Sequence, residues 1–253
     1  MTGGWRIHAV AATHPGLVRR INEDRYCTRD DVGLWAVADG MGGHAHGDWA
    51  SNAVVQALES VLVPLDFRAA TQTVADAVHS ANRRVFGEAQ RRGQQMGSTV
   101  VSLLVQDGCF AALWVGDSRA YVLRDGDLHP LTRDHSQVQE MVDRGLITEA
   151  EAHNHPRGHV LARAIGVGAR LAVDVVTDEV AAGDLFLLCS DGLTGMLDNA
   201  AIARILAEPY PQAALDALIA GALAGGAPDN VTAILVAVQE GTQRAPLSMG
   251  SAL

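Results

Sequence analysis

Hydrophobic and polar positions alternate along this chain with two different periods, which predict where strands and helices lie. Near the N-terminus, residues 5–13 and 33–38 have the apolar patterns of strands, with a turn near residues 30–33. Apolar residues then recur at helical spacing. This predicts one helix over residues 48–63, ending before Pro64, and a second over residues 68–90.

From Gly97 onward the period changes to two, and Asp-Gly turns separate the apolar runs. Asp107-Gly108 joins the runs at 99–105 and 109–115, and Asp125-Gly126 joins those at 120–124 and 128–131. Asp-Gly between apolar runs is a strong hairpin signal, so we expect two antiparallel pairs. The remaining elements are strands over 171–176, 185–189 and 231–238 and helices over 200–206 and 212–223.

The order of these elements, with strands and helices in runs, predicts an α+β fold with mainly antiparallel sheets and a single domain over residues 1–240. Residues 132–170 are polar, rich in histidine and only partly helical, which indicates a long excursion from the sheet. Residues 241–253 are polar and contain glycine and proline, so we expect a disordered tail.

Composition narrows the class of protein. With 253 residues, 48% hydrophobic and 19% charged, the chain has ample material for a core and is not intrinsically disordered. A net charge of −10 argues against a nucleic-acid partner, because the phosphate backbone would be repelled. Apolar runs fall far short of the ~20 residues of a membrane span, and no signal segment opens the sequence. We therefore expect a cytoplasmic protein with no membrane partner.

The cysteines and the basic residues exclude several kinds of chemistry. Cys27, Cys109 and Cys189 are widely spaced and odd in number, which is typical of reduced core thiols rather than of a disulfide framework or a zinc site. All 19 Lys and Arg positions are arginine. Without lysine the chain has no P-loop, no protein-kinase active site and no Schiff-base chemistry.

Four aspartates stand where apolar strands begin or end. Asp39, Asp117 and Asp191 each follow a predicted strand, and Asp229 shortly precedes one. In an antiparallel sheet these positions can share one rim. Crowded carboxylates repel one another unless cations neutralise them, and an oxygen-only set of this kind suits Mg²⁺ or Mn²⁺.

The alternative for each of these aspartates is a plain turn, since Asp-Gly is a turn dipeptide. That interpretation fits Asp107 and Asp125, because a pairing strand follows each at once. It fits Asp39 and Asp191 less well, because a glycine-rich or helix-leading segment follows them. Taken together, the pattern favours a metal site.

Six short motifs carry a resemblance to a known family. They are GLVRRINED at residues 16–24, ADGMGGH at 38–44, GST at 97–99, VGDSR at 115–119, CSDGL at 189–193 and PDNVT at 228–232. In this order and at these intervals, over residues 6–238, they resemble the metal-dependent serine/threonine phosphatases of the PPM family, the protein phosphatase 2C type, in compact bacterial form. The resemblance implies a four-layer αββα sandwich, with two central antiparallel β-sheets flanked by helices.

The family also implies two or three Mn²⁺ or Mg²⁺ ions at one rim. By motif position, their ligands are Asp39 between the two main metals, Asp191 and Asp229 on the first, Asp24 and the Gly40 carbonyl on the second, and Asp117 with Asp191 on a third. Glu23 is a candidate either to replace Asp24 as a metal ligand or to hold Asp24 in position without binding the metal itself. Asn230 is a second candidate for such a supporting position.

The implied reaction is hydrolysis of phosphoserine or phosphothreonine by direct attack of a water that the metals share, with no covalent phosphoenzyme. Arg19 matches the arginine that grips the substrate phosphate, a role suited to its planar, two-pronged donor. The chain departs from many relatives at Met41, where they have a histidine proposed as the general acid. A metal-bound water or His44 would serve instead, so His44 joins Arg19 and Asp39 as a catalytic candidate.

The implied partners are phosphoserine and phosphothreonine proteins and a cognate serine/threonine kinase, with a kinase that regulates type VI secretion as one candidate. The segment at residues 132–170 corresponds to the family's flap beside the active site. Its role is either the choice of protein substrates or simple cover against solvent. A lone catalytic domain of this size is expected to be a monomer.

Three other functions compete with this one. A serine hydrolase would use Ser118, whose surroundings nearly match a nucleophile elbow, but an elbow needs a following helix and a hairpin follows here. A non-catalytic phosphoprotein-binding module would have lost a metal aspartate, and none is missing. A hydrolase of small phosphoesters would share the chemistry, and activity on a phosphothreonine peptide against a nucleotide separates the two.

Overall fold

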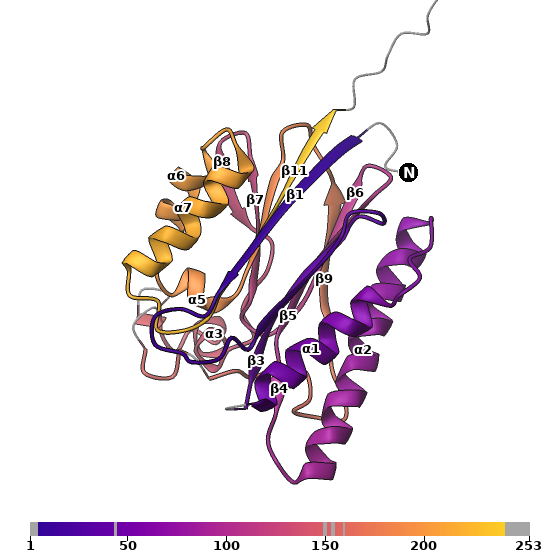
Figure 1. Ribbon diagram of the computed structural model, residues 1–253, viewed down its shortest axis with the longest axis vertical. Helices are drawn as coiled ribbons and strands as arrows, with labels where there is room; N and C mark the ends of the chain where they lie inside the picture. Colours follow the sequence, from indigo (N-terminus) through magenta and orange to yellow (C-terminus); the bar gives the residue numbers. More distant parts are fainter. Residues whose placement is uncertain (1–4, 43–44, 149–150, 153–154, 159, 241–253) are drawn as a thin grey trace, which may run out of the picture.

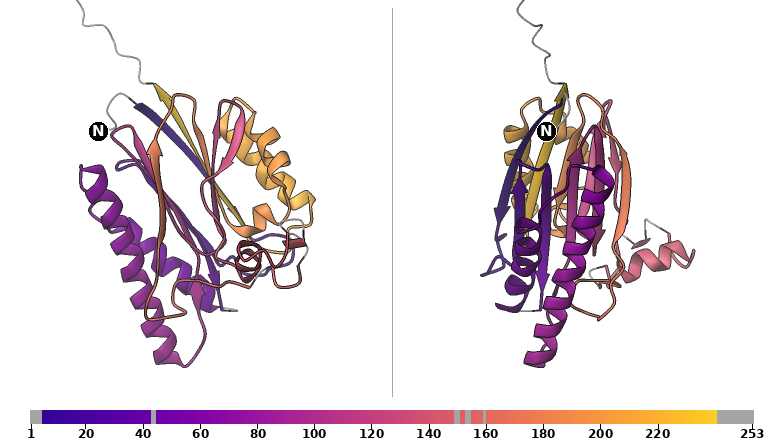
Figure 2. Two further views of the ribbon diagram at one scale, coloured as in Figure 1. Left: turned by 180° about the vertical axis from the view of Figure 1, so that it is seen from behind. Right: turned by 90° about the vertical axis from the view of Figure 1, so that its right-hand side faces the viewer.

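The computed structural model describes residues 5–42, 45–148, 151–152, 155–158 and 160–240. Two antiparallel sheets pack face to face at its centre, and helices cover the outer face of each (Figure 1 and Figure 2). This four-layer αββα sandwich confirms the fold class predicted from the sequence.

Each sheet is built from strands that are distant in sequence. The first sheet contains, in spatial order, β1 (Trp5–His14), β11 (Val231–Glu240), β10 (Leu185–Cys189), β7 (Arg119–Arg124) and β8 (Asp127–Pro130). The second contains β2 (Asp24–Arg29), β3 (Leu34–Met41), β5 (Val100–Gln106), β6 (Cys109–Val115) and β9 (Asp174–Glu179), with the short β4 (Gly97–Ser98) paired to β3.

The helices divide between the two outer faces. The second sheet is covered by α1 (Ala45–Glu59) and α2 (Phe67–Arg92), on the right in Figure 1. The first is covered by α5 (Asp191–Thr194), α6 (Asn199–Leu206) and α7 (Pro211–Ala224), on the left. Between β8 and β9 lies the excursion predicted from its polar sequence, and it contains α3 (Gln137–Asp143). Among the described residues, none of the helices is long and apolar enough to cross a membrane.

The strands bury both faces, because one faces the other sheet and the opposite one faces helices. In β3, Trp35 packs into the core between the sheets, where Phe110 and Phe186 meet edge to face at 4.9 Å. The neighbouring Leu34 and Ala36 point the other way, into the core under α1 and α2. This explains why β3 reads as a nearly continuous apolar run.

Both Asp-Gly hairpins form as predicted. Asp107 and Asp125 have φ angles of 51° and 54°, and Gly108 and Gly126 after them have φ angles of 78° and 89°. Positive φ at both central positions is typical of a type I′ turn, whose twist matches that of paired strands. The interpretation of these two dipeptides as plain turns is therefore confirmed. The described cysteines are free, as expected from the sequence.

Strand β2 was not foreseen from the sequence. It reads DRYCTR, and only Asp24 and Cys27 in it are buried. Because β2 is the edge strand of its sheet, one side of it faces solvent and tolerates polar residues. A polar edge strand lacks the apolar alternation on which the prediction depends.

Two predicted boundaries are wrong by several residues. The first helix ends at Glu59 rather than at residue 63, and the carbonyl of Val61 beyond it accepts a hydrogen bond from Arg29 Nη1 at 2.6 Å. The strand predicted at 171–176 is β9, at Asp174–Glu179. Leu171 and Val173 produced the misplaced strand signal because they pack on the core under α2 without pairing to a strand.

Candidate active site

The aspartates singled out from the sequence meet at one end of the sandwich. Asp24 begins β2 and lies opposite Asp39 of β3 in the antiparallel register. Asp191 begins α5 just after β10, and Asp229 lies just before β11, which pairs with β10. Burial raises the pKa of Asp39 well above its usual value, and the charges of Asp24, Asp191, Asp117 and Asp229 raise it further. The structure thus brings the other four carboxylates within electrostatic range of Asp39.

The glycines after Asp39 and Asp191 serve close packing rather than a turn. A Cβ atom on Gly40 would lie 2.1 Å from a backbone carbonyl oxygen in the first turn of α1. A Cβ atom on Gly192 would lie 1.9 Å from the carbonyl oxygen of Asn230. Neither glycine has the positive φ of the hairpin turns. These two Asp-Gly dipeptides are therefore structurally distinct from the turn dipeptides of the same sequence.

Asp24 is almost fully enclosed, with 1% of its surface exposed. Its Oδ2 atom accepts hydrogen bonds from Ser190 Oγ at 2.8 Å and from Thr232 Oγ1 at 2.7 Å. Its Oδ1 atom is buried and has no hydrogen-bond partner within the described ranges. Burial raises the pKa of Asp24 to about 7 in spite of the two hydroxyl donors. A buried carboxylate oxygen without a donor is the kind of atom that a cation satisfies.

Hydroxyl groups beside the acids orient them, which the sequence analysis did not foresee. Ser190 is the N-cap residue of α5, yet its hydroxyl bonds to Asp24 rather than capping the helix. Thr99 Oγ1 accepts a hydrogen bond from the backbone N–H of Asp39 at 3.0 Å and lies 2.7 Å from Ser118 Oγ. Ser190 and Ser118 each adjoin a predicted ligand in the sequence, and that adjacency is the signal that could have identified them.

Ser118 does not stand at a nucleophile elbow. It is 1% exposed, and its hydroxyl lies in the hydrogen bond with Thr99. The chain continues directly into β7, which pairs with β8. A nucleophile elbow needs an exposed serine on a strand-to-helix turn. The sequence-based argument against a serine hydrolase is confirmed.

Asp117 lies in a turn tied to the start of the long excursion. Burial raises the pKa of Asp117 to about 8, and the charges of Asp191 and Asp134 act in the same direction. The backbone N–H of Gly116 donates to His135 Nδ1 at 3.1 Å, and the N–H of His135 donates to the Gly116 carbonyl at 2.8 Å. The excursion is thus hydrogen-bonded to the turn that carries this predicted ligand.

Arg19 points at the acids. Its Nη2 donates to Asp229 Oδ2 at 2.8 Å, and its side chain is half exposed. This ion pair was not expected, because the family resemblance assigns Arg19 to a substrate phosphate and Asp229 to a metal. Ion pairs this exposed contribute about 0–1 kcal/mol, so an arriving anion and cation can separate the two partners at little cost.

Asn230 ties the loop that carries Arg19 to the rest of the site. Its side chain is nearly buried, and its Oδ1 accepts from the backbone N–H of Glu23 at 2.7 Å. Its Nδ2 donates to the carbonyls of Pro15 at 3.0 Å and Ile21 at 3.1 Å. One side chain therefore fixes both ends of the segment before β2.

We expect Asn230→Ala to lower the free energy of unfolding by about 3 kcal/mol, because three backbone groups lose the hydrogen bonds that they make to this buried side chain. Urea unfolding followed by circular dichroism measures this loss. Asn199→Ala, at an exposed position at the start of α6, is the control and should change stability by less than about 0.5 kcal/mol. A loss below about 1 kcal/mol for Asn230→Ala would show that the loop is held by other contacts.

Four further residues named from the sequence are Glu23, Gly40, Met41 and His44, and the structure describes the first three. Glu23 Oε1 is buried without a hydrogen-bond partner in the described part of the chain, and burial raises the Glu23 pKa. The Gly40 N–H donates to the Glu23 carbonyl at 3.2 Å. Met41 pairs with Gly97 across β3 and β4. His44 lies outside the described residues.

Comparisons with known proteins show to which family the chain belongs. A family model described as Protein phosphatase 2C matches residues 19–219, which is most of the chain. The chain belongs to the protein phosphatase 2C family. The resemblance drawn from the six motifs is confirmed.

Two curated relatives within the protein phosphatase 2C family are similar over most of this chain. Serine/threonine protein phosphatase PstP of Mycobacterium tuberculosis is 36% identical over 239 residues, which are 90% of this chain and 44% of the relative. Serine/threonine phosphatase stp of Listeria innocua is 33% identical over 240 residues, which are 91% of this chain and 95% of the relative. The chain thus spans less than half of the first relative and nearly all of the second.

Solved structures of family members superpose on the whole sandwich. PppA, described as a key regulatory component of T6SS in Pseudomonas aeruginosa, is 39% identical with a TM-score of 0.85, covering 91% of this chain and 97% of that one. The catalytic domain of PstP in complex with two manganese ions is 35% identical with a TM-score of 0.84, and the match covers 93% of this chain and 100% of that one. A metal-dependent phosphatase of this family therefore has the same fold.

The donor set predicted for this protein phosphatase 2C member fits hard divalent cations. It consists of carboxylates and a backbone carbonyl, without thiolates or clustered imidazoles. Burial raises the pKa values of Asp24, Asp39 and Asp117, and the charges of neighbouring aspartates raise them further, so a bound cation would relieve both effects. Metal dependence follows from the family and agrees with this chemistry.

As the side chains stand, no group of three or more acidic, histidine or cysteine side chains in the described ranges is arranged to hold a metal ion. One predicted ligand is engaged by a positive charge of the protein itself, because Asp229 Oδ2 accepts a hydrogen bond from Arg19 Nη2. A cation at Asp229 would therefore compete with Arg19 for this oxygen.

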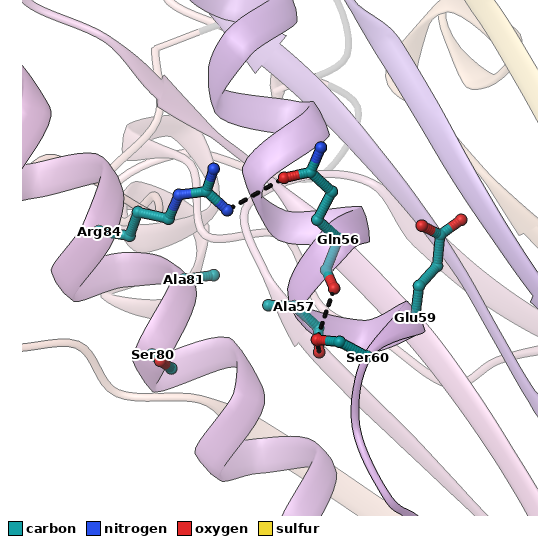
Figure 3. Close-up of a pocket in the computed structure, with 7 residues that line it drawn as sticks. All are labelled: Gln56, Ala57, Glu59, Ser60, Ser80, Ala81 and Arg84. Carbon is teal, nitrogen blue, oxygen red and sulfur yellow. Dashed lines mark hydrogen bonds between the residues drawn. The ribbon is translucent and has the colours of Figure 1, made fainter.

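A separate hollow of about 580 Å³ lies between α1 and α2 (Figure 3). Gln56, Glu59, Ser60 and Arg84 are among its lining residues, and Arg84 Nη1 donates to Gln56 Oε1 at 3.1 Å. None of the residues predicted at the carboxylate site lines it. The hollow is thus no part of the candidate active site.

Proposed function

We propose that this chain hydrolyses the phosphate monoesters of phosphoserine and phosphothreonine in proteins, with Mn²⁺ or Mg²⁺ as cofactors. The observation that carries the proposal is the convergence of five aspartates and one arginine at one end of the sandwich. The relatives named as serine/threonine phosphatases support the choice of substrate.

The residues proposed to hold cations are Asp39 between two sites, Asp191 and Asp229 on one, Asp24 and the Gly40 carbonyl on the other, and Asp117 with Asp191 at a third. When bound, such cations supply a water of lowered pKa and stabilise the charge that develops on the phosphoryl oxygens. This assignment gives Asp39 the central position, in agreement with the four neighbouring charges that act on it.

The remaining residues preset this arrangement. The hydroxyls of Ser190 and Thr232 hold Asp24 Oδ2, which leaves Oδ1 for a cation and removes the need to reorient the side chain on binding. Thr99 fixes the backbone of Asp39. Arg19 is proposed to exchange Asp229 for the substrate phosphate, to which its guanidinium can donate two parallel hydrogen bonds.

Arg19→Ala is expected to raise KM for a phosphothreonine peptide by about tenfold or more and to change kcat less. Arginine grips the phosphate in the ground state as well as in the transition state, so its loss weakens both similarly. Steady-state kinetics with a synthetic peptide tests this. Arg204→Ala removes an exposed guanidinium on α6 and serves as the control. An unchanged KM in Arg19→Ala would remove Arg19 from the phosphate site.

The class of substrate is tested by comparing a phosphothreonine peptide with a nucleoside monophosphate in the presence of Mn²⁺. We expect kcat/KM for the peptide to be higher. Preference for the nucleotide would favour a hydrolase of small phosphoesters. Metal binding without turnover of either substrate would favour the non-catalytic phosphoprotein-binding alternative.

The proposed cellular role is to reverse the action of a serine/threonine kinase. PppA, a relative at 39% identity, is described as a key regulatory component of T6SS, which makes a secretion-regulating kinase one candidate partner. Phosphoproteomic comparison of cells with and without this gene tests the role, because sites that gain phosphate in its absence are the expected substrates.

A further inference from the structure

A run of exposed residues lies next to the carboxylate site. Leu17, Val18 and Ile21 have 63%, 68% and 46% of their surfaces exposed, and they flank Arg19 and Arg20, which are also exposed. We call residues 17–21 the Arg19 loop. Three large aliphatic side chains are thus exposed within five residues of the chain beside the site, and exposed apolar surface that is concentrated in one place marks interaction surfaces.

The Arg19 loop is held by its backbone while its side chains stay outside the core. The N–H of Leu17 donates to the Ala227 carbonyl at 2.9 Å. At the two ends, Asn230 donates to the carbonyls of Pro15 and Ile21. Because the backbone of the loop is already held in place, it loses little conformational entropy when a partner binds. The burial of its aliphatic side chains therefore contributes almost fully to affinity.

This inference rests on the proposed function, because that function identifies the molecule that binds at the Arg19 loop. Arg19 lies inside the loop and is proposed to grip the substrate phosphate. An extended chain advances about 3.3–3.6 Å per residue, so the residues on either side of a phosphorylated serine or threonine held there lie against the loop. Aliphatic side chains at those positions would lose water together with Leu17, Val18 and Ile21.

We propose that the Arg19 loop selects substrates, favouring phosphoprotein segments with aliphatic residues immediately beside the phosphorylated serine or threonine. Arg20 makes the loop locally basic in a chain of net charge −10, which draws a phosphorylated segment to this place in preference to the rest of the surface. The selectivity itself comes from the apolar contact.

The test compares two phosphothreonine peptides of equal length and charge, one with leucine and one with serine on both sides of the phosphothreonine. For each we measure kcat/KM with Mn²⁺ and, with labelled peptide, the Kd by fluorescence anisotropy. Wild type is expected to favour the leucine peptide by about tenfold in both, the factor expected for burial of one aliphatic side chain. Leu17→Ser/Val18→Ser is expected to reduce this ratio to about one.

The matched control is Leu62→Ser/Leu65→Ser. These leucines are even more exposed, at 88% and 77%, but they lie in the connection between α1 and α2. Gln106, at the end of β5 away from the carboxylates, donates to the Pro64 carbonyl there. The control is expected to keep the wild-type ratio. If Leu17→Ser/Val18→Ser does not fold by circular dichroism, Ile21→Ser replaces it.

Equal Kd and equal kcat/KM for the two peptides in wild type would overturn the proposal. So would a wild-type preference that persists in the loop variants. A wild-type dimer that the loop variant converts to a monomer, with no change in the peptide ratio, would instead assign the loop to a contact between copies. Failure of the proposed function is distinct from these results: it gives no turnover of either phosphothreonine peptide, while the Kd ratio still tests the loop.

Discussion

Asp39→Asn is expected to lower kcat/KM for p-nitrophenyl phosphate by about 10³-fold or more while raising the melting temperature of the metal-free protein. Activity falls because the central carboxylate of the proposed metal site is lost. Metal-free stability rises because Asp39 is largely desolvated and lies among four other aspartates whose charges oppose its own. A gain in stability together with a loss of activity would mean that the Asp39 carboxylate destabilises the metal-free fold and is needed for the reaction.

Two assays test this prediction, and each needs a control. Turnover is measured with excess Mn²⁺, and melting is followed by circular dichroism in EDTA. Asp127→Asn, on the exposed face of β8, should leave both quantities near the wild-type values. If Asp39→Asn kept near-normal activity, the assignment of Asp39 to the metals would be wrong. If Asp39→Asn instead lowered the melting temperature in EDTA, the proposed repulsion between Asp39 and its four neighbouring aspartates would be wrong.

Metal is expected to stabilise the protein most at alkaline pH. The pKa of Asp24 is raised to about 7 and that of Asp117 to about 8. A carboxyl whose pKa is higher in the folded state contributes its full stability below its unfolded pKa, about 3.9 for aspartate, and loses it as the pH rises through the folded pKa. Without metal, this share of stability is therefore lost as the pH rises from about 4 to about 8, and none of it remains above that range.

Cations remove that loss because they neutralise the carboxylates. At a Mn²⁺ concentration about 100 times Kd, the melting temperature should rise by about 5–10 °C at pH 8 and by less at pH 6, where protons compete with the metal. The comparison uses the difference between Mn²⁺ and EDTA at each pH, so that titration of groups elsewhere cancels. A difference that is larger at pH 6 than at pH 8 would contradict the account.

Much of this fold could be predicted because its strands are strongly patterned. The two Asp-Gly hairpins and the apolar run of β3 follow from local sequence alone. Strand β2 could not be predicted, because an edge strand with two buried residues has little apolar signal. The boundary of β9 was wrong because Leu171 and Val173 face the core without belonging to the sheet.

The positions of the site's acids could be predicted, and their partners could not. Asp39 and Asp191 differ from the turn aspartates in the segments that come directly after them along the chain, and local sequence shows this difference. The hydroxyls that hold Asp24 come from Ser190 and Thr232, 166 and 208 residues away along the chain. Such contacts depend on the register of β10 and β11 in the other sheet, which local patterns do not specify. The ion pair of Arg19 with Asp229 likewise joins residues that are far apart in the sequence, so local patterns do not predict it.

The most direct test of the central claim is hydrolysis of p-nitrophenyl phosphate by the purified protein, first with Mn²⁺ or Mg²⁺, then after excess EDTA, and again after the metal is restored. We expect turnover that EDTA abolishes and that added metal recovers. Turnover that persists at full rate in EDTA, or a folded protein that binds Mn²⁺ and shows no turnover, would contradict the assignment of these aspartates to a metal-dependent phosphatase.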